Sequence, residues 1–258
     1  KVVASGAVPV ALTDCLCFGS PEKPEQMWQF AESCRAIRDC CDDLRFEKNT
    51  NLPIVAGNVS FYNQSGDNAI PSSPMIGCFG KNIDVNKSIQ NSFQSNDSVV
   101  FLLGGEKNSM GGSVVTSLLA TNNNSVHRFS NKQFSQMLNG LIGLGSQELI
   151  LSSRVVARGG LAVSLCKMSF QNNIGINAHL GSDKFAERLF NENLSILIEV
   201  HDADAKNVEK ILEKKDIPFD IIGTTCSEKT IAINDRVSLS INEAKNVWEN
   251  SLREKLLS

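Results

Sequence analysis

The stretch Ala11-Leu12-Thr13-Asp14-Cys15-Leu16-Cys17-Phe18-Gly19-Ser20-Pro21 decides how the first part of the chain is organised. It begins within an apolar run at residues 9–13, which predicts a short buried strand, and passes at Asp14 into a loop of small residues. From residue 25 to residue 44, apolar side chains recur at the spacing of one face of an α-helix. The sequence therefore predicts a strand, a loop and a long helix.

The rest of the chain mixes strand and helix patterns. A strand at 52–56 runs into Gly57-Asn58-Val59-Ser60, and a polar stretch near Gly66 predicts a boundary between domains at 1–66 and 67–258. Residues 86–97 are polar and weakly patterned, which predicts a surface connection. Further strands are expected at 75–79, 98–103, 195–200, 219–224 and 230–234, and helices at 131–144, 159–169, 204–215 and 242–256. This order indicates an α/β or α+β fold.

Composition limits the class of protein. The 258 residues are 41% hydrophobic and 21% charged with a net charge of −3, which predicts no nucleic-acid partner and no anionic membrane partner. Eight scattered cysteines and the lack of a long apolar run indicate reduced thiols and a cytoplasmic protein. Because Lys1 leads directly into Val2-Val3-Ala4-Ser5-Gly6, we expect this opening to be the end of an element in a longer chain.

Polar residues follow two of the predicted strands and form the best candidate site. Asp14 follows the first strand and Gly57-Asn58-x-Ser60 follows the second, so we expect these residues to converge where ligands commonly bind. Asp14 could orient a nucleotide, Gly57 allows close backbone approach, Asn58 offers a hard oxygen to Mg²⁺, and Ser60 could donate to a phosphate or hydroxyl. The alternative is that Asp14 and Asn58 only stabilise turns.

Two other sets of residues give weaker signals. The histidines His127, His179 and His201 are too far apart for a zinc motif or a nucleophile triad, and surface positions are expected for them. Cys15-x-Cys17 could be a metal or redox pair, but without partner ligands in the sequence we favour packing as small apolar residues.

A family resemblance rests on several of these stretches. Residues 11–25 closely resemble the signature A-L-T-D-C-L-N-F-G-N-P-E-K-P-E of phosphoribosylformylglycinamidine synthase, and residues 57–63 resemble its G-N-V-S-L-Y-N block. Later blocks, including Gly159-Gly160-Leu161 and Ile221-Ile222-Gly223-Thr224, also look like the family's closing domain. The resemblance covers essentially the whole chain.

This resemblance implies a fold and a reaction. The chain would be the second half of the enzyme without its beginning: a truncated ATP-binding domain of the aminoimidazole ribonucleotide synthetase type, followed by a C-terminal α/β domain. The enzyme would use ATP and Mg²⁺ to convert formylglycinamide ribonucleotide and ammonia to the amidine in purine biosynthesis. A glutaminase subunit would supply the ammonia, and a small bridging subunit could join them.

The resemblance also implies roles for single residues. Asp14 and Gly57 fall where the family contacts ATP, Asn58 where it ligates Mg²⁺ and Ser60 where it touches the substrate. The catalytic residues would lie in the missing N-terminal half, so this chain alone is expected to be inactive.

The chain departs from the family pattern at two places. Cys17 and Ser20 replace asparagines, and residues 152–160 read S-S-R-V-V-A-R-G-G where the family has S-A-H-D-V-S-E-G-G. The second change inverts local charge, so a polar or metal-linked role of that segment in relatives does not carry over to this chain. Because Arg154 and Arg158 precede a predicted helix, we expect them to form either an anion contact or a solvated edge. Two alternatives stay open: a non-catalytic half that completes its partner's site, and a sister enzyme such as aminoimidazole ribonucleotide synthetase or selenophosphate synthetase.

Overall fold

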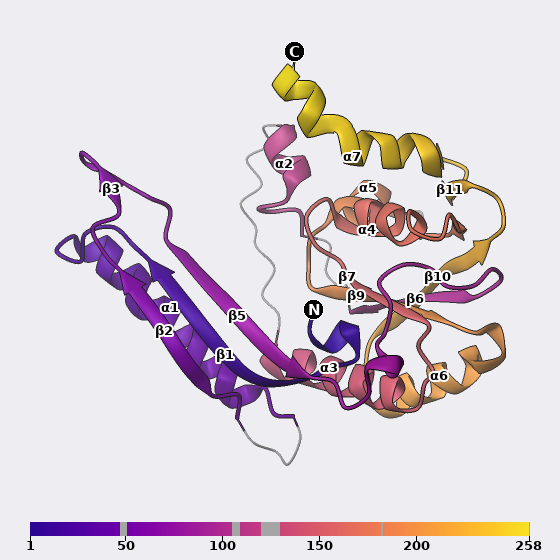
Figure 1. Ribbon diagram of the computed structural model, residues 1–258, viewed down its shortest axis with the longest axis horizontal. Coiled ribbons are helices and arrows are strands. Elements are labelled where there is room, and N and C mark those ends of the chain that lie inside the picture. The colour runs from indigo at the N-terminus through magenta and orange to yellow at the C-terminus, as the bar shows by residue number, and fades with distance from the viewer. Residues whose placement is uncertain (47–50, 105–108, 120–129, 182, 258) are drawn as a thin grey trace.

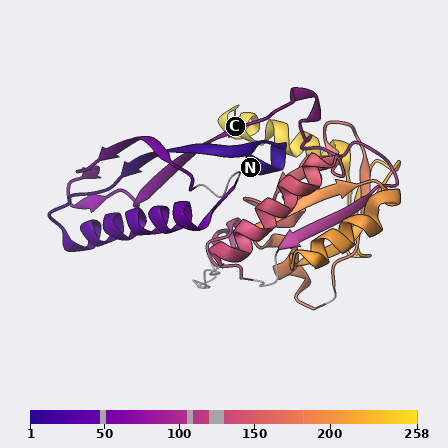
Figure 2. The same cartoon turned by 90° about the horizontal axis from the view of Figure 1, so that it is seen from below.

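A computed structural model describes residues 1–46, 51–104, 109–119, 130–181 and 183–257. The chain forms two units, of which the first is a three-stranded sheet with one long helix along one face (Figures 1 and 2). The sheet has the order β2-β1-β5, with β2 parallel and β5 antiparallel to the central β1. The elements of this unit are η1 (Val3–Ser5), β1 (Val8–Cys17), α1 (Pro24–Asp43), β2 (Ile54–Ser60), the hairpin β3 (Gln64–Ser65) and β4 (Asn68–Ala69), and β5 (Ser73–Lys81).

Strands β1 and β2 are longer than the sequence predicts. The expectation that Asp14 and Gly57 follow the ends of their strands is wrong, because β1 continues to Cys17 and β2 continues to Ser60. The physical reason is that β1 is paired along both edges, so its backbone groups stay hydrogen-bonded through the polar residues. Pairing thus overrides the turn preference of Asp14.

The predicted boundary at Gly66 falls in the β3–β4 hairpin and stays a prediction. Beyond the hairpin, β5 pairs with β1 from Val8 opposite Lys81 to Cys17 opposite Ser73. The first sheet therefore draws one of its three strands from beyond Gly66. We propose that the two units divide between β5 and β6.

The second unit is a seven-stranded mixed sheet in the order β12-β11-β8-β10-β6-β9-β7, with helices on both faces. Helices α3 and α6 pack on one face, while α4, α5 and α7 pack on the other. Its elements are η3 (Val85–Lys87), β6 (Val99–Gly104), α2 (Val114–Leu118), α3 (Asn131–Ser146), β7 (Ser152–Val155), α4 (Gly160–Ser169), β8 (Gly175–Ala178), α5 (Phe185–Phe190), β9 (Ser195–Val200), α6 (Asp202–Lys214), β10 (Phe219–Cys226), β11 (Thr230–Ile233), β12 (Val237–Ser240) and α7 (Ile241–Leu257). The α+β fold class is confirmed.

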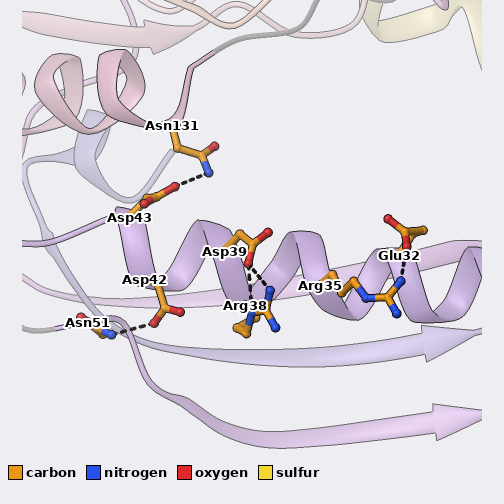
Figure 3. Close-up of polar contacts among 8 residues, drawn as sticks. All are labelled: Glu32, Arg35, Arg38, Asp39, Asp42, Asp43, Asn51 and Asn131. Carbon is orange, nitrogen blue, oxygen red and sulfur yellow. Dashed lines mark hydrogen bonds and ion pairs between the residues drawn. The ribbon is translucent and has the colours of Figure 1, made fainter.

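One hydrophobic core joins the two units. Val3, Leu44, Phe46 and Leu52 of the first unit are buried in the same cluster as the inner faces of α3, α6, β6 and β9. Polar contacts at the end of α1 reinforce this joint: the Asn131 side-chain amide donates to the Asp43 carboxylate across 2.7 Å (Figure 3). The Glu32–Arg35 and Arg38–Asp39 ion pairs of α1 are exposed and contribute little stability (Figure 3).

The expected surface connection at 86–97 is wrong at Ser92 and Phe93, whereas residues 94, 96 and 97 are exposed. Ser92 and Phe93 are 1% and 0% exposed, and Phe93 belongs to the core under α4. Backbone amides of Gln94 and Ser95 donate to the buried carboxylate of Glu199 on β9. In the described part of the chain, no helix combines the length and apolar character required to cross a membrane.

Candidate functional site

Asp14 and Gly57 lie side by side on the paired strands β1 and β2. They are direct Cα partners in the parallel ladder, and a Cβ atom built on Gly57 would lie 2.7 and 2.8 Å from the Asp14 carboxylate oxygens. Gly57 therefore provides the space that the Asp14 side chain occupies. No hydrogen bond from the described residues reaches this half-buried carboxylate, so it is free to accept one from a ligand.

Asn58 follows Gly57 on β2, and its side chain lies on the opposite face of the sheet from Asp14. Its side-chain amide donates to Cys15 Sγ across 3.6 Å, and Cys15 is also its Cα partner. Because successive residues of a strand point to opposite faces, Cys15 and Asn58 project away from the face that carries Asp14 and Gly57. The predicted proximity is confirmed for the backbone, but the side chains diverge.

The Asp14 face is the one that α1 covers. Asp14, the buried Leu16 and Phe18 are two residues apart, so their side chains share one face. Phe18 packs edge-to-face on Phe30 of α1, with ring centroids 5.4 Å apart. The opposite face carries Cys15, Cys17 and Asn58.

Ser60 is engaged at the end of β2. Its hydroxyl exchanges hydrogen bonds with the Asn63 side chain at 3.1 and 3.3 Å, and the Asn63 amide also donates to the Phe18 carbonyl at 3.0 Å. Asn63 thus ties the end of β1 to the end of β2, a role that the sequence analysis missed. The signal for it was an asparagine three residues after the end of β2, a residue type that is typical of turns.

The Asn58 face does not by itself fit a magnesium ion. Asn58 contributes one neutral oxygen, and the described residues contain no group of three or more His, Cys, Asp or Glu side chains able to hold a metal. Protein sites for Mg²⁺ use one or two carboxylates with water and phosphate oxygens. Since Asp14 points to the other face, the predicted ligand role of Asn58 stays a prediction.

The segment at 152–160, which departs from the family pattern, begins with the edge strand β7. Arg154 is half-buried and its Nε donates to the Asn91 carbonyl across 3.0 Å, while Arg158 is exposed. Burial lowers the pKa of Arg154. His179 and His201 are exposed, as predicted, and His127 lies outside the described residues.

Comparison with known families agrees with this two-unit structure. Residues 1–81 match the N-terminal domain of AIR synthase related proteins, and residues 96–236 match the C-terminal domain of the same group. The chain belongs to the AIR synthase related protein family. Its matched domains are separated by residues 82–95, between strands β5 and β6.

Sequence relatives of this AIR synthase related chain carry a common name. It is 33% identical over 98% of its length to phosphoribosylformylglycinamidine synthase subunit PurL of Thermobifida fusca, covering 33% of that protein. It is 32% identical over 99% of its length to the same-named subunit of Methanothrix thermoacetophila, covering 34%. The chain therefore spans about a third of the length of these relatives.

Solved structures support the fold. The chain matches Thermotoga maritima PurL complexed with ATP with a TM-score of 0.70 at 14% identity, covering 94% of this chain and 39% of that one. It matches T. maritima PurL complexed with FGAR with a TM-score of 0.69 at 13% identity, covering 94% and 40%. At such identities the likeness establishes the fold alone.

Proposed function

We propose that the chain forms part of an ATP-dependent amidoligase of purine biosynthesis. The whole protein would convert formylglycinamide ribonucleotide, ATP and glutamine-derived ammonia to formylglycinamidine ribonucleotide. The observation that carries this proposal is the match of 98–99% of the chain to relatives named as subunits of phosphoribosylformylglycinamidine synthase. The solved PurL complexes with ATP and with FGAR are consistent with it, since they share the fold.

The proposed contacts follow from the two faces of the β1–β2 pair. The unpaired Asp14 carboxylate would accept hydrogen bonds from the nucleotide, and Gly57 would keep that carboxylate in place beside β2. Asn58 would offer one oxygen at most to Mg²⁺, and Ser60 would exchange its bond to Asn63 for one to substrate. The family's reaction needs Mg²⁺ to neutralise phosphate charge when it is bound.

The proposed assembly extends beyond this chain. We propose that the remaining part of the same polypeptide, a glutaminase subunit and a small bridging subunit work with it in the cytoplasm. A solved relative is described as PurLQS from Thermotoga maritima, an assembly that includes PurL.

A second candidate function is a half that completes its partner's site without chemistry of its own. Two observations favour it: Asp14 and Asn58 lie on opposite faces of the sheet, and Ser60 is already hydrogen-bonded. Arg154 also stands where the family resemblance places a histidine, beside Val155 in place of an acid.

The test is ADP release and amidine formation by the full-length protein with Mg-ATP, formylglycinamide ribonucleotide and ammonium. Ammonium replaces the glutaminase partner, so we expect substrate-dependent ADP from the full-length protein and none from residues 1–258 alone. A full-length protein that forms no amidine while a known relative does so in parallel would contradict the ligase. Product formed by residues 1–258 alone would contradict the proposal that the remaining chain supplies the catalytic groups.

A further inference from the structure

The face of β1 opposite Asp14 carries a pair of thiols that the proposed reaction does not use. Cys15 and Cys17 are two residues apart on one strand, so both project to the same face. Their sulfur atoms lie 3.9 Å apart, and both side chains are half-buried. Cys17 is also a departure from the family signature, which has asparagine there.

The sulfur separation matches that of two ligands on one metal ion. A metal–sulfur bond of about 2.3 Å with a tetrahedral or trigonal angle at the metal places two sulfurs about 3.8 to 4.0 Å apart. The observed 3.9 Å falls within that interval and is too long for a disulfide bond. The two thiols therefore need little movement to hold one ion between them.

The neighbouring strand offers a third soft donor. Met75 of β5 is the direct Cα partner of Cys15 in the antiparallel ladder, which places its thioether on the same face. Met75 is 53% exposed, so its side chain can swing toward the pair at little cost in packing. On the other side, the Asn58 amide already donates to Cys15 Sγ. The donors that can close around an ion are thus two thiols and one thioether.

We propose that Cys15, Cys17 and Met75 form a binding site for a soft monovalent metal ion of the Cu(I) class. Thiolate and thioether donors select Cu(I), whereas zinc prefers four nitrogen, sulfur or carboxylate ligands. No third His, Cys, Asp or Glu joins the pair within the described ranges, which disfavours zinc. Binding forms two copper–thiolate bonds and releases the two thiol protons, with no change in the oxidation state of the metal or the sulfurs.

The remaining thiols provide the contrast. Cys78 lies on β5 of the same sheet and is exposed, and its ladder partner is Leu12. It therefore projects to the face opposite that of its neighbour Gly77, which pairs with Thr13. Cys226 lies on β10 of the second unit, away from this sheet. Of the three cysteines on this sheet, Cys15 and Cys17 therefore share one face and Cys78 lies on the other.

The test is a competition titration of the reduced full-length protein with Cu(I) against the chelator bicinchoninate, without oxygen. We expect one tightly bound equivalent, a fall in affinity of at least about tenfold in Cys15→Ser and Cys17→Asn, and a smaller fall in Met75→Leu. Cys78→Ser is the matched control and should bind like the parent protein. Circular dichroism verifies folding, and Cys17→Asn restores the residue of the family signature.

Four outcomes would overturn the proposal. Parent-like Cu(I) affinity in Cys17→Asn, or an equal loss in Cys78→Ser, would remove the paired thiols as the site. Unchanged affinity in Met75→Leu would remove the thioether as a ligand. Zinc bound at the same stoichiometry and with the same cysteine dependence would overturn the assignment to the Cu(I) class.

Discussion

Replacing Glu199 with glutamine is expected to lower the free energy of unfolding by about 3 kcal/mol. The Glu199 carboxylate is 0% exposed and lies on β9 in the core of the second unit. It accepts hydrogen bonds from donors in residues 94–98 and on β7: Gln94 N at 2.9 and 3.0 Å, Ser95 N at 3.0 Å, Ser98 Oγ at 2.7 Å and Ser152 Oγ at 2.6 Å. A glutamine keeps the shape but turns an NH₂ group toward some of these donors, which leaves them unpaired.

Urea unfolding followed by circular dichroism measures this change. Glu213→Gln on the exposed side of α6 is the matched control, and it should stay within about 0.5 kcal/mol of the parent protein. A Glu199→Gln protein within that same margin would contradict the view that this carboxylate holds residues 94–98 against the sheet.

Gly160→Ala is expected to cost about 3 to 5 kcal/mol of stability. Gly160 has a φ of +68°, a conformation that an L side chain rarely adopts. A Cβ atom there would lie 2.7 Å from the Phe190 carbonyl carbon and 2.8 Å from the carbonyl oxygens of Leu189 and Asn191. These atoms are backbone, so they cannot rotate away, and the start of α4 would have to shift.

Gly143→Ala is the control for Gly160→Ala, because it makes the same chemical change in a different environment. Gly143 lies within α3, and a Cβ atom there has no neighbour within 4 Å. The substitution should stabilise the protein by up to about 1 kcal/mol, since alanine favours the helix. Thermal unfolding of both variants gives the comparison, and equal effects would contradict the steric account of Gly160.

Long and strongly patterned elements were predictable from the sequence. The apolar spacing at 25–44 indicated α1, and the run Ser195–Val200 indicated β9. Strands β7 and β8 were missed because each is four residues long and neither Ser-Ser-Arg-Val nor Gly-Ile-Asn-Ala alternates in polarity. Helices α2 and α5, of five and six residues, are likewise too short for a periodic signal.

The candidate site was predictable in position but not in geometry. The spacing of Asp14 and Asn58 brought the correct strands together, yet the faces on which their side chains lie depend on the ladder register, which a single sequence does not reveal. Glu199 was missed although its signal is present. A carboxylate within the apolar run Ser-Ile-Leu-Ile-Glu-Val must either reach solvent or find buried donors. Most of its donors come from a segment about 100 residues earlier in the chain.

The most direct test of the central claim is turnover of the full-length protein with Asp14 changed to alanine, measured as substrate-dependent ADP release with saturating ammonium. If the β1–β2 pair contacts the reacting nucleotide, Asp14→Ala should lower kcat/KM by at least about tenfold. The substitution removes the carboxylate that would contact the nucleotide. Cys78→Ser on the same sheet should keep the parent rate. Parent-like turnover in Asp14→Ala, with the protein folded, would contradict the claim and leave this chain as the half that only supports its partner.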